Sequence, residues 1–141
     1  MKFPDFLRVI GDQSYRNKNC PMETLEQVTF VNRLRKQYPD TLGRLVVHIK
    51  NEGKRTHGQA MMDAANGLTK GAADILIPVS PAIVIEMKRR DHTLSSWQPG
   101  QIDYLKAAHD AGSFVFVALG ADAAMEGIEE WLRTTRMIEN G

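Results

Sequence analysis

Two short apolar segments separated by a proline-bounded turn restrict the fold of this chain more than any other feature. The first runs from Asp74 to Pro78 and the second from Ala82 to Met87. Both are apolar at successive positions, which indicates strands that are covered on both faces of a sheet. The turn between them is short enough to make the strands antiparallel neighbours. We therefore predict a single-domain α/β fold with a central mixed β-sheet flanked by helices.

Other segments supply the flanking elements. The apolar spacing and the breaker residues predict helices over Glu23–Tyr38, Gln59–Asn66, Pro99–Asp110 and Ala123–Leu132, and strands over Leu45–Ile49 and Ser113–Leu119. In the first helix, apolar residues recur every three positions, and we expect this stripe, which includes Leu25 and Val28, to face the core. Residues 1–20 are less regular, and the apolar residues between Phe3 and Ile10 fit one amphipathic turn.

Composition excludes several classes of protein. The chain has 141 residues, which fits one domain, and its net charge of +1 means that any attraction to phosphate is local. Its single cysteine, Cys20, forms neither an intramolecular disulfide nor a cysteine-based zinc site. The first ten residues lack the apolar core of a signal peptide, and no apolar run has the length of a bilayer span. We expect a cytoplasmic protein with no membrane association.

The hairpin brings three charged residues together. If its loop is Val79–Pro81, counting outward along the two strands places Asp74 directly opposite Glu86. Residues opposed in an antiparallel pair point to the same sheet face, with Cβ atoms roughly 5 Å apart. Lys88 lies two residues beyond Glu86 and therefore shares that face. One face of the sheet is thus predicted to present all three at the rim of the apolar core.

This grouping favours a metal site. Two opposed carboxylates repel each other, so one holds a proton or a cation binds between them. Magnesium prefers oxygen ligands, and the backbone carbonyl of Met87 is a candidate third ligand beside Asp74 and Glu86. The amine of Lys88 is suited to orienting or deprotonating an attacking water near a phosphate. The alternative interpretation is an edge ion pair between Glu86 and Lys88, and a change of one residue in the loop would break the facing arrangement.

With these residues in place, Asp74 and Glu86-Met87-Lys88 resemble the Asp…Glu-x-Lys core of the PD-(D/E)XK nuclease superfamily. The flanking residues narrow the resemblance. They are Glu23-Thr-Leu-Glu-Gln27 at the start of the first helix, Lys50-Asn51-Glu52-Gly53-Lys54-Arg55 after the first strand, Gly71-Ala72-Ala73-Asp74, and Gln101 near the start of a later helix. Their order and spacing resemble the virus-type replication-repair nuclease (VRR-NUC) domain, especially its stand-alone phage forms, over Glu23 to Leu132. Accordingly, we divide the chain into an N-terminal extension (1–22), the nuclease domain (23–135) and a C-terminal tail (136–141).

The resemblance implies a restriction-endonuclease-like fold and a role for each matched residue. Asp74, Glu86 and Glu23 match the metal ligands, Lys88 matches the catalytic lysine, and Gln101 matches a glutamine that supports the site. Two positions depart from the family pattern. Ala73 stands where the family usually has proline, and Gln98 stands where it often has serine, so that Gln98 competes with Gln101 for the glutamine role. Glu26 similarly competes with Glu23, although it lies on a different face of the predicted helix.

Basic and aromatic residues near these motifs are candidates for contact with nucleic acid. The candidates are Asn51, Lys54, Arg55, Lys70, Arg89 and Arg90. Trp97 either stacks on a base or covers a small apolar patch. The four histidines lack the spacing of a zinc site.

Three functional hypotheses follow. The first is a Mg²⁺- or Mn²⁺-dependent DNA endonuclease of phage type, and the resemblance implies branched DNA such as four-way junctions, a homodimer, and the host cytoplasm. The second is a restriction-like or exonucleolytic nuclease that acts on linear DNA. The third is a non-catalytic α/β module that binds DNA or a protein partner.

Overall fold

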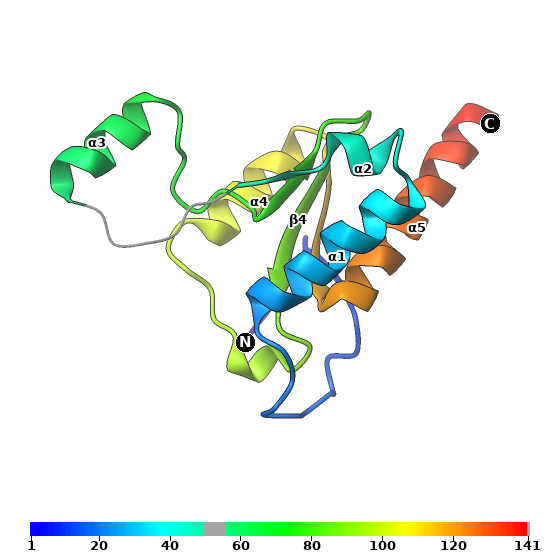
Figure 1. Ribbon diagram of the computed structural model, residues 1–141, viewed down its shortest axis with the longest axis horizontal. Helices are drawn as coiled ribbons and strands as arrows, with labels where there is room; N and C mark the ends of the chain where they lie inside the picture. The colour runs from blue at the N-terminus through cyan, green and yellow to red at the C-terminus, as the bar shows by residue number, and fades with distance from the viewer. Residues whose placement is uncertain (50–55, 141) are drawn as a thin grey trace.

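The computed structural model describes residues 1–49 and 56–140 (Figure 1). Within these residues, five strands form one mixed sheet in the order β1-β5-β4-β3-β2. The strands are β1 (Arg8–Ile10), β2 (Val47–His48), β3 (Ile75–Ile77), β4 (Ile83–Lys88) and β5 (Phe114–Leu119). Strands β1, β5 and β4 run parallel to one another, while β3 is antiparallel to both β4 and β2. The predicted mixed α/β architecture is confirmed.

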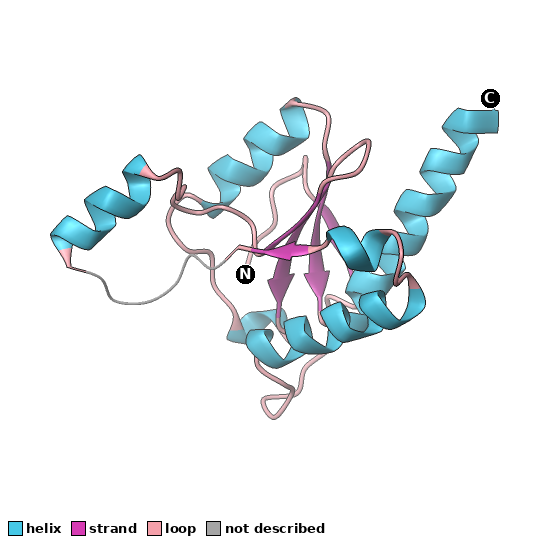
Figure 2. Cartoon of the chain, turned by 45° about the horizontal axis from the view of Figure 1, so that its top comes forward, coloured by secondary structure: helices cyan, strands magenta, loops and turns pink. Residues whose placement is uncertain are grey.

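Helices cover both faces of this sheet (Figure 2). The helices of the described residues are α1 (Glu23–Gln37), α2 (Leu42–Leu45), α3 (His57–Ala65), α4 (Gln101–Asp110) and α5 (Ala121–Asn140), with a short 3₁₀ helix η1 at His92–Leu94, and α3 alone of the α-helices stands apart from the sheet. Among the residues described, no helix combines the length and the apolar character needed to cross a membrane.

The alternation of side chains along β4 and β5 separates two apolar cores. Ile83, Ile85 and Met87 point toward α1 and α5, where they pack with residues such as Phe30. Val84 points the other way and packs with Leu105 of α4. Because successive strand residues face opposite sides, Glu86 and Lys88 lie on the α4 face with Val84.

The buried face of α1 differs from the predicted one. Leu25 and Val28 are 57% and 51% exposed, whereas Phe30 and Leu34 are fully buried. The expectation that Leu25 and Val28 face the core is therefore wrong. Residues four apart share a helix face more closely than residues three apart over several turns, and here Glu26 occupies the first position of the buried face.

Glu26 is buried because it binds the start of another helix. Its Oε2 atom accepts a hydrogen bond from the backbone N–H of Ala121, the first residue of α5, at 3.2 Å. A carboxylate is stabilised at a helix N-terminus, where backbone N–H groups lack partners within the helix. Glu26 therefore fastens α1 to α5 and takes no part in the group around Asp74.

Within the first ten residues, Arg8–Ile10 form a strand, and no helix forms where the spacing suggests a helical turn. β1 lies within the segment set apart as an N-terminal extension, and it pairs in parallel with β5, with Arg8 opposite Phe116. Leu7 and Ile10 are buried on opposite faces of the sheet. The strand predicted over Leu45–Ile49 is shorter than expected, because Leu45 ends α2 and only Val47 and His48 pair with β3.

The central hairpin has the register that the sequence predicts. Ile75 pairs with Ile85 and Ile77 with Ile83. This pairing continues outward to place Asp74 opposite Glu86, at the end of the sheet where β3 begins.

Candidate active site

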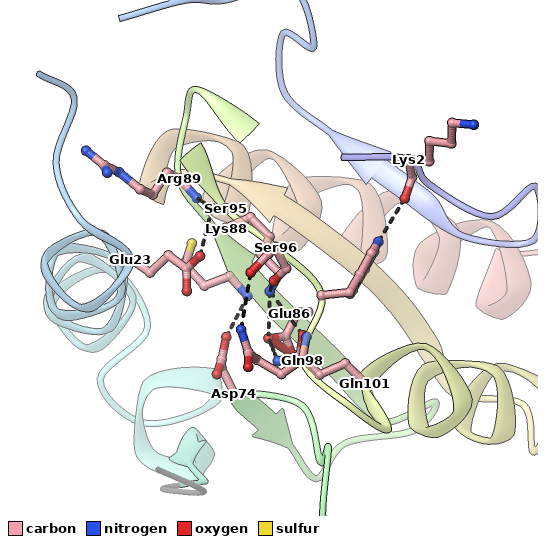
Figure 3. A network of polar contacts seen from close by, with 12 residues as sticks. Lys2, Glu23, Asp74, Glu86, Lys88, Arg89, Ser95, Ser96, Gln98 and Gln101 are labelled. Carbon is pink, nitrogen blue, oxygen red and sulfur yellow. Dashed lines mark hydrogen bonds and ion pairs between the residues drawn. The ribbon is translucent and has the colours of Figure 1, made fainter. Parts of the chain in front are cut away.

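Asp74 and Glu86 meet on the α4 face of the sheet (Figure 3). Asp74 immediately precedes β3 and is half-buried, while Glu86 lies inside β4 and is 1% exposed. Oδ2 of Asp74 accepts a hydrogen bond from the backbone N–H of Met87 at 2.9 Å. The N–H and C=O of one strand residue point to the same side of the strand, so the Met87 carbonyl is also directed toward the Asp74 side of β4.

The Glu86 carboxyl group has one partnered and one unpartnered oxygen. Oε1 accepts a hydrogen bond from Nε2 of Gln101 at 2.9 Å. Oε2 is buried and has no hydrogen-bond partner among the residues that the structure describes. Burial, and then the neighbouring Asp74 carboxylate, raise the pKa of Glu86 to about 10, while the Lys88 ammonium acts in the opposite direction. Without a cation, Glu86 therefore keeps its proton at neutral pH.

Lys88 is as deeply buried as Glu86, at 1% exposure. Its Nζ donates to the backbone carbonyl of Ser96 at 2.9 Å and to Oε1 of Gln101 at 3.1 Å. The same Nζ lies 3.8 Å from Oε1 of Glu86. A buried ammonium needs such acceptors, because its hydration is lost. The three contacts hold the amine beside the two carboxyl groups.

Gln101, and not Gln98, reaches this site. It is the first residue of α4, and its amide joins Lys88 through Oε1 and Glu86 through Nε2. Gln98 is exposed, and its side chain donates to Oγ of Ser96, at 3.2 Å. Gly100 between them adopts a φ of +88°, a conformation that glycine permits and that starts the helix at Gln101.

Glu23 approaches the site from the start of α1. Its Oε1 accepts a hydrogen bond from Oγ of Ser95 at 2.7 Å, and Ser95 in turn accepts one from the backbone N–H of Arg89 at 3.0 Å. Ser95 cannot be assigned a role from sequence alone, because its partner lies 72 positions away on another element. Ser95 thus links Glu23 to the end of β4.

The site opens into a cleft of about 870 Å³. Its walls include Glu23, Asp74, Glu86, Lys88 and Gln101, and on the opposite side Ala60, Ala64, Leu68 and Lys70 from α3 and the residues after it. α3 itself stands apart from the sheet, and none of its residues is buried (Figure 1). Thr56 caps α3 by accepting the Gln59 N–H at 3.1 Å.

The residues expected to contact nucleic acid occupy different places. Lys70 is exposed and lines the cleft. Arg90 is exposed, with its guanidinium 4.8 Å from the centre of the Tyr15 ring. Arg89 instead donates to the backbone carbonyls of Cys20 and Pro21, just before α1. Asn51, Lys54 and Arg55 lie outside the described residues.

Comparison with known proteins supports the same fold. A solved structure described as a "VRR_NUC domain protein" superposes with a TM-score of 0.67, covering 80% of this chain and 89% of its own length at 19% identity. The chain has a VRR-NUC-like fold. No protein-family model and no curated protein matches the sequence. A likeness at this identity establishes the fold, and the chemistry rests on the residues of the VRR-NUC-like site itself.

The donor set of this VRR-NUC-like site fits a divalent cation that keeps several waters. Across residues 1–49 and 56–140, no three acidic, histidine or cysteine side chains stand close enough to form a complete ligand cluster. Asp74 and Glu86 nevertheless face each other, and Oε2 of Glu86 is a buried oxygen without a partner. Magnesium is usually bound through one or two carboxylates plus water and substrate phosphate, so this pair is sufficient.

Proposed function

We propose that this protein is a metal-dependent DNA endonuclease that hydrolyses phosphodiester bonds. The observation that carries the proposal is the unpartnered Oε2 of Glu86, a residue that is buried opposite Asp74 and whose other carboxyl oxygen, Oε1, lies 3.8 Å from the Lys88 amine. A nuclease requires oxygen ligands for a hard cation and a cationic group beside the phosphate. Both are present on one face of the hairpin, at the wall of an open cleft.

Asp74, Glu86 and the carbonyl of Met87 would hold the ion, and Glu23, which lines the same cleft from the start of α1, would complete the site through a water bound to the ion. A bound Mg²⁺ or Mn²⁺ would polarise the phosphate and lower the pKa of a water molecule. Lys88 offsets negative charge on the phosphate and orients the attacking water. Gln101 fixes the positions of the Lys88 amine and the Glu86 carboxylate relative to each other through its two hydrogen bonds.

The cleft of about 870 Å³ beside the site is where a nucleic-acid strand would bind. Lys70 on its wall and Arg90 outside it would contact phosphates without reading sequence. We extend the proposal to branched DNA and to a phage context, on the strength of the sequence resemblance and the VRR-NUC-like fold. A panel of hairpin, linear and four-way-junction substrates tests this extension, and exonucleolytic shortening of linear DNA alone would contradict it.

We also propose that two copies act together as a homodimer, because paired nicks in a junction need two sites. An apolar surface on the start of α1 supports this proposal. Met22, Leu25 and Val28 are 69%, 57% and 51% exposed. Large apolar side chains gathered on one surface are typical of contact sites. Mass measurement in solution should give twice the chain mass for the wild type and a monomer for Leu25→Glu.

The test of the function itself compares three purified variants on the substrate panel, with magnesium, manganese and chelator lanes. Asp74→Ala and Glu86→Ala should abolish cleavage and leave DNA binding largely intact. Asp40→Ala removes an exposed carboxylate after α1 and should cut like the wild type. If either active-site variant cuts as fast as the wild type with magnesium, the proposed function is wrong.

A further inference from the structure

The indole ring of Trp97 packs against the buried amine of Lys88. The Lys88 Nζ lies 5.2 Å from the centre of the Trp97 ring, which is within the range of a cation–π contact. The indole ring is thus a fourth neighbour of this amine, whose other neighbours are the Ser96 carbonyl, Gln101 and Glu86. Cation–π attraction is stronger when the cation has lost its water, and Lys88 is 1% exposed.

The N-terminal segment fixes the orientation of this ring. Nε1 of Trp97 donates a hydrogen bond to the backbone carbonyl of Lys2 at 2.8 Å. The Phe3 ring meets the indole edge-on, with ring centres 6.1 Å apart and an angle of 83° between the planes. The segment is anchored in turn by β1, which pairs with β5. Residues that are distant in sequence from the site therefore define where the indole lies.

Trp97 is not among the described residues that line the cleft. The cleft is lined by Ser95, Ser96, Gln98 and Pro99 of the same loop, and Trp97 is absent from its walls. The ring instead packs among the apolar residues beneath α4, near Leu7 and Leu105. Its position therefore favours an influence on the reaction through Lys88 over stacking on a base bound in the cleft.

We propose that Trp97 is a positioning residue for Lys88, held in place by Lys2 and Phe3 of the N-terminal segment. This inference rests on the proposed nuclease function. It also gives the segment before α1 a part in the active site. The ring restricts the amine to the position beside Glu86, and its removal lets the amine move away from the phosphate.

Steady-state cleavage by two substitutions tests the proposal. Trp97→Leu keeps an apolar side chain but removes the aromatic face, and it should lower kcat by roughly tenfold with little change in KM. Trp97→Phe keeps an aromatic face and loses the hydrogen bond to Lys2, so its kcat should lie between those of Trp97→Leu and the wild type. An unchanged kcat in Trp97→Leu, or a rise in KM alone, would overturn the positioning role.

Phe6→Leu is the matched control. The Phe6 ring belongs to the same apolar cluster, and the Lys106 amine lies 5.6 Å from its centre. Lys106 is exposed, pairs with Asp110 of the same helix at 2.7 Å, and is not among the described residues that line the cleft. This control removes an aromatic ring and a cation–π contact of the same kind, and its kcat should equal that of the wild type. An equal loss of kcat in Phe6→Leu and Trp97→Leu would mean that general packing, rather than Lys88, is responsible.

A spectroscopic readout separates this proposal from the function on which it rests. In the NMR spectrum of the full chain, the ε-methylene protons of Lys88 should lie upfield of those of the other lysines, because they sit near the face of an indole ring. The shift should disappear in Trp97→Leu. Absence of the shift in the wild type overturns the placement, whatever the activity. A wild type that shows the shift but cuts no DNA overturns the nuclease function, while the contact between Trp97 and Lys88 stands.

Discussion

The backbones of Gly71 and Gly100 are in direct contact, so that a Cβ on Gly71 would stand 2.3 Å from the carbonyl carbon of Gly100. Gly71 is three residues before Asp74, and Gly100 immediately precedes Gln101. The contact therefore sets the distance between the strand that carries one carboxylate and the helix that carries the supporting amide. Both glycines have positive φ angles, +80° and +88°, which side-chain-bearing residues rarely adopt.

Gly71→Ala should destabilise the protein and reduce cleavage, because the added methyl group meets backbone atoms that cannot rotate away. Gly112→Ala is the matched control, since Gly112 has a φ of +98° but no atom within 4 Å of the point where a Cβ would lie. Both variants force alanine into a positive φ angle, which destabilises the folded state. Only Gly71→Ala also overpacks its surroundings, which typically costs about 1–3 kcal/mol. Urea unfolding measures the difference, and equal losses in the two variants would show that the contact is unimportant.

The raised pKa of Glu86 predicts how stability depends on pH in the absence of metal. Its ordinary pKa is near 4.5 and its folded value is about 10, so the folded chain keeps a proton that the unfolded chain has released. Stability should therefore fall as pH rises through this window, by on the order of 1 kcal/mol per pH unit. Unfolding should be measured with chelator between about pH 7 and 9. The pKa values of Asp12 and Asp91 are lowered and that of Tyr38 is raised, so these three groups titrate outside this range.

Glu86→Gln isolates this effect. The amide cannot ionise, so the free energy of unfolding of the Glu86→Gln protein should change less with pH than that of the wild type. Added magnesium should reverse the trend in the wild type, because a cation replaces the proton and binds better as pH rises. Parallel pH dependences for the wild type and Glu86→Gln in chelator would contradict the assignment.

The sequence predicts the hairpin and its facing carboxylates because both depend on local rules. Strand side chains alternate with a period of two, the prolines place the turn near Val79–Pro81, and the observed pairing of Ile77 with Ile83 agrees with that loop. The register that places Asp74 opposite Glu86 follows from these constraints alone. The sequence favours Gln101 over Gln98 only through its distance to Gly112, and the structure decides between them, because α4 begins at Gln101 and its amide reaches Lys88 and Glu86.

Features that depend on distant contacts cannot be predicted in this way. A spacing of three in α1 suggests a stripe through Leu25 and Val28, but the buried face is set by Phe30 and by Glu26, whose partner is the start of α5. The strand at Arg8 forms only because β5, far along the chain, offers a free edge. No local pattern carries that information.

Gln101→Leu should lower kcat by roughly 100-fold, as is typical when a residue that orients the groups of a metal site is lost. The substitution removes the donor to Glu86 and the acceptor for Lys88 at once. Gln98→Leu removes only the contact with Ser96 and should cut at the wild-type rate. Single-turnover cleavage with saturating magnesium gives the comparison. A larger loss in Gln98→Leu would exchange the roles of the two glutamines.

Ser95→Ala should raise the magnesium concentration needed for half-maximal cleavage, by roughly 10-fold. The hydroxyl of Ser95 holds Oε1 of Glu23 at 2.7 Å, and without it the carboxylate is free to turn away from the site. If Glu23 helps to bind the ion, excess magnesium should restore most of the rate. Ser96→Ala is the control, because its hydroxyl contacts Gln98, while the carbonyl that binds Lys88 is retained. Identical magnesium dependences for Ser95→Ala and the wild type would remove Glu23 from the metal site, since loosening a ligand must weaken the binding of its ion.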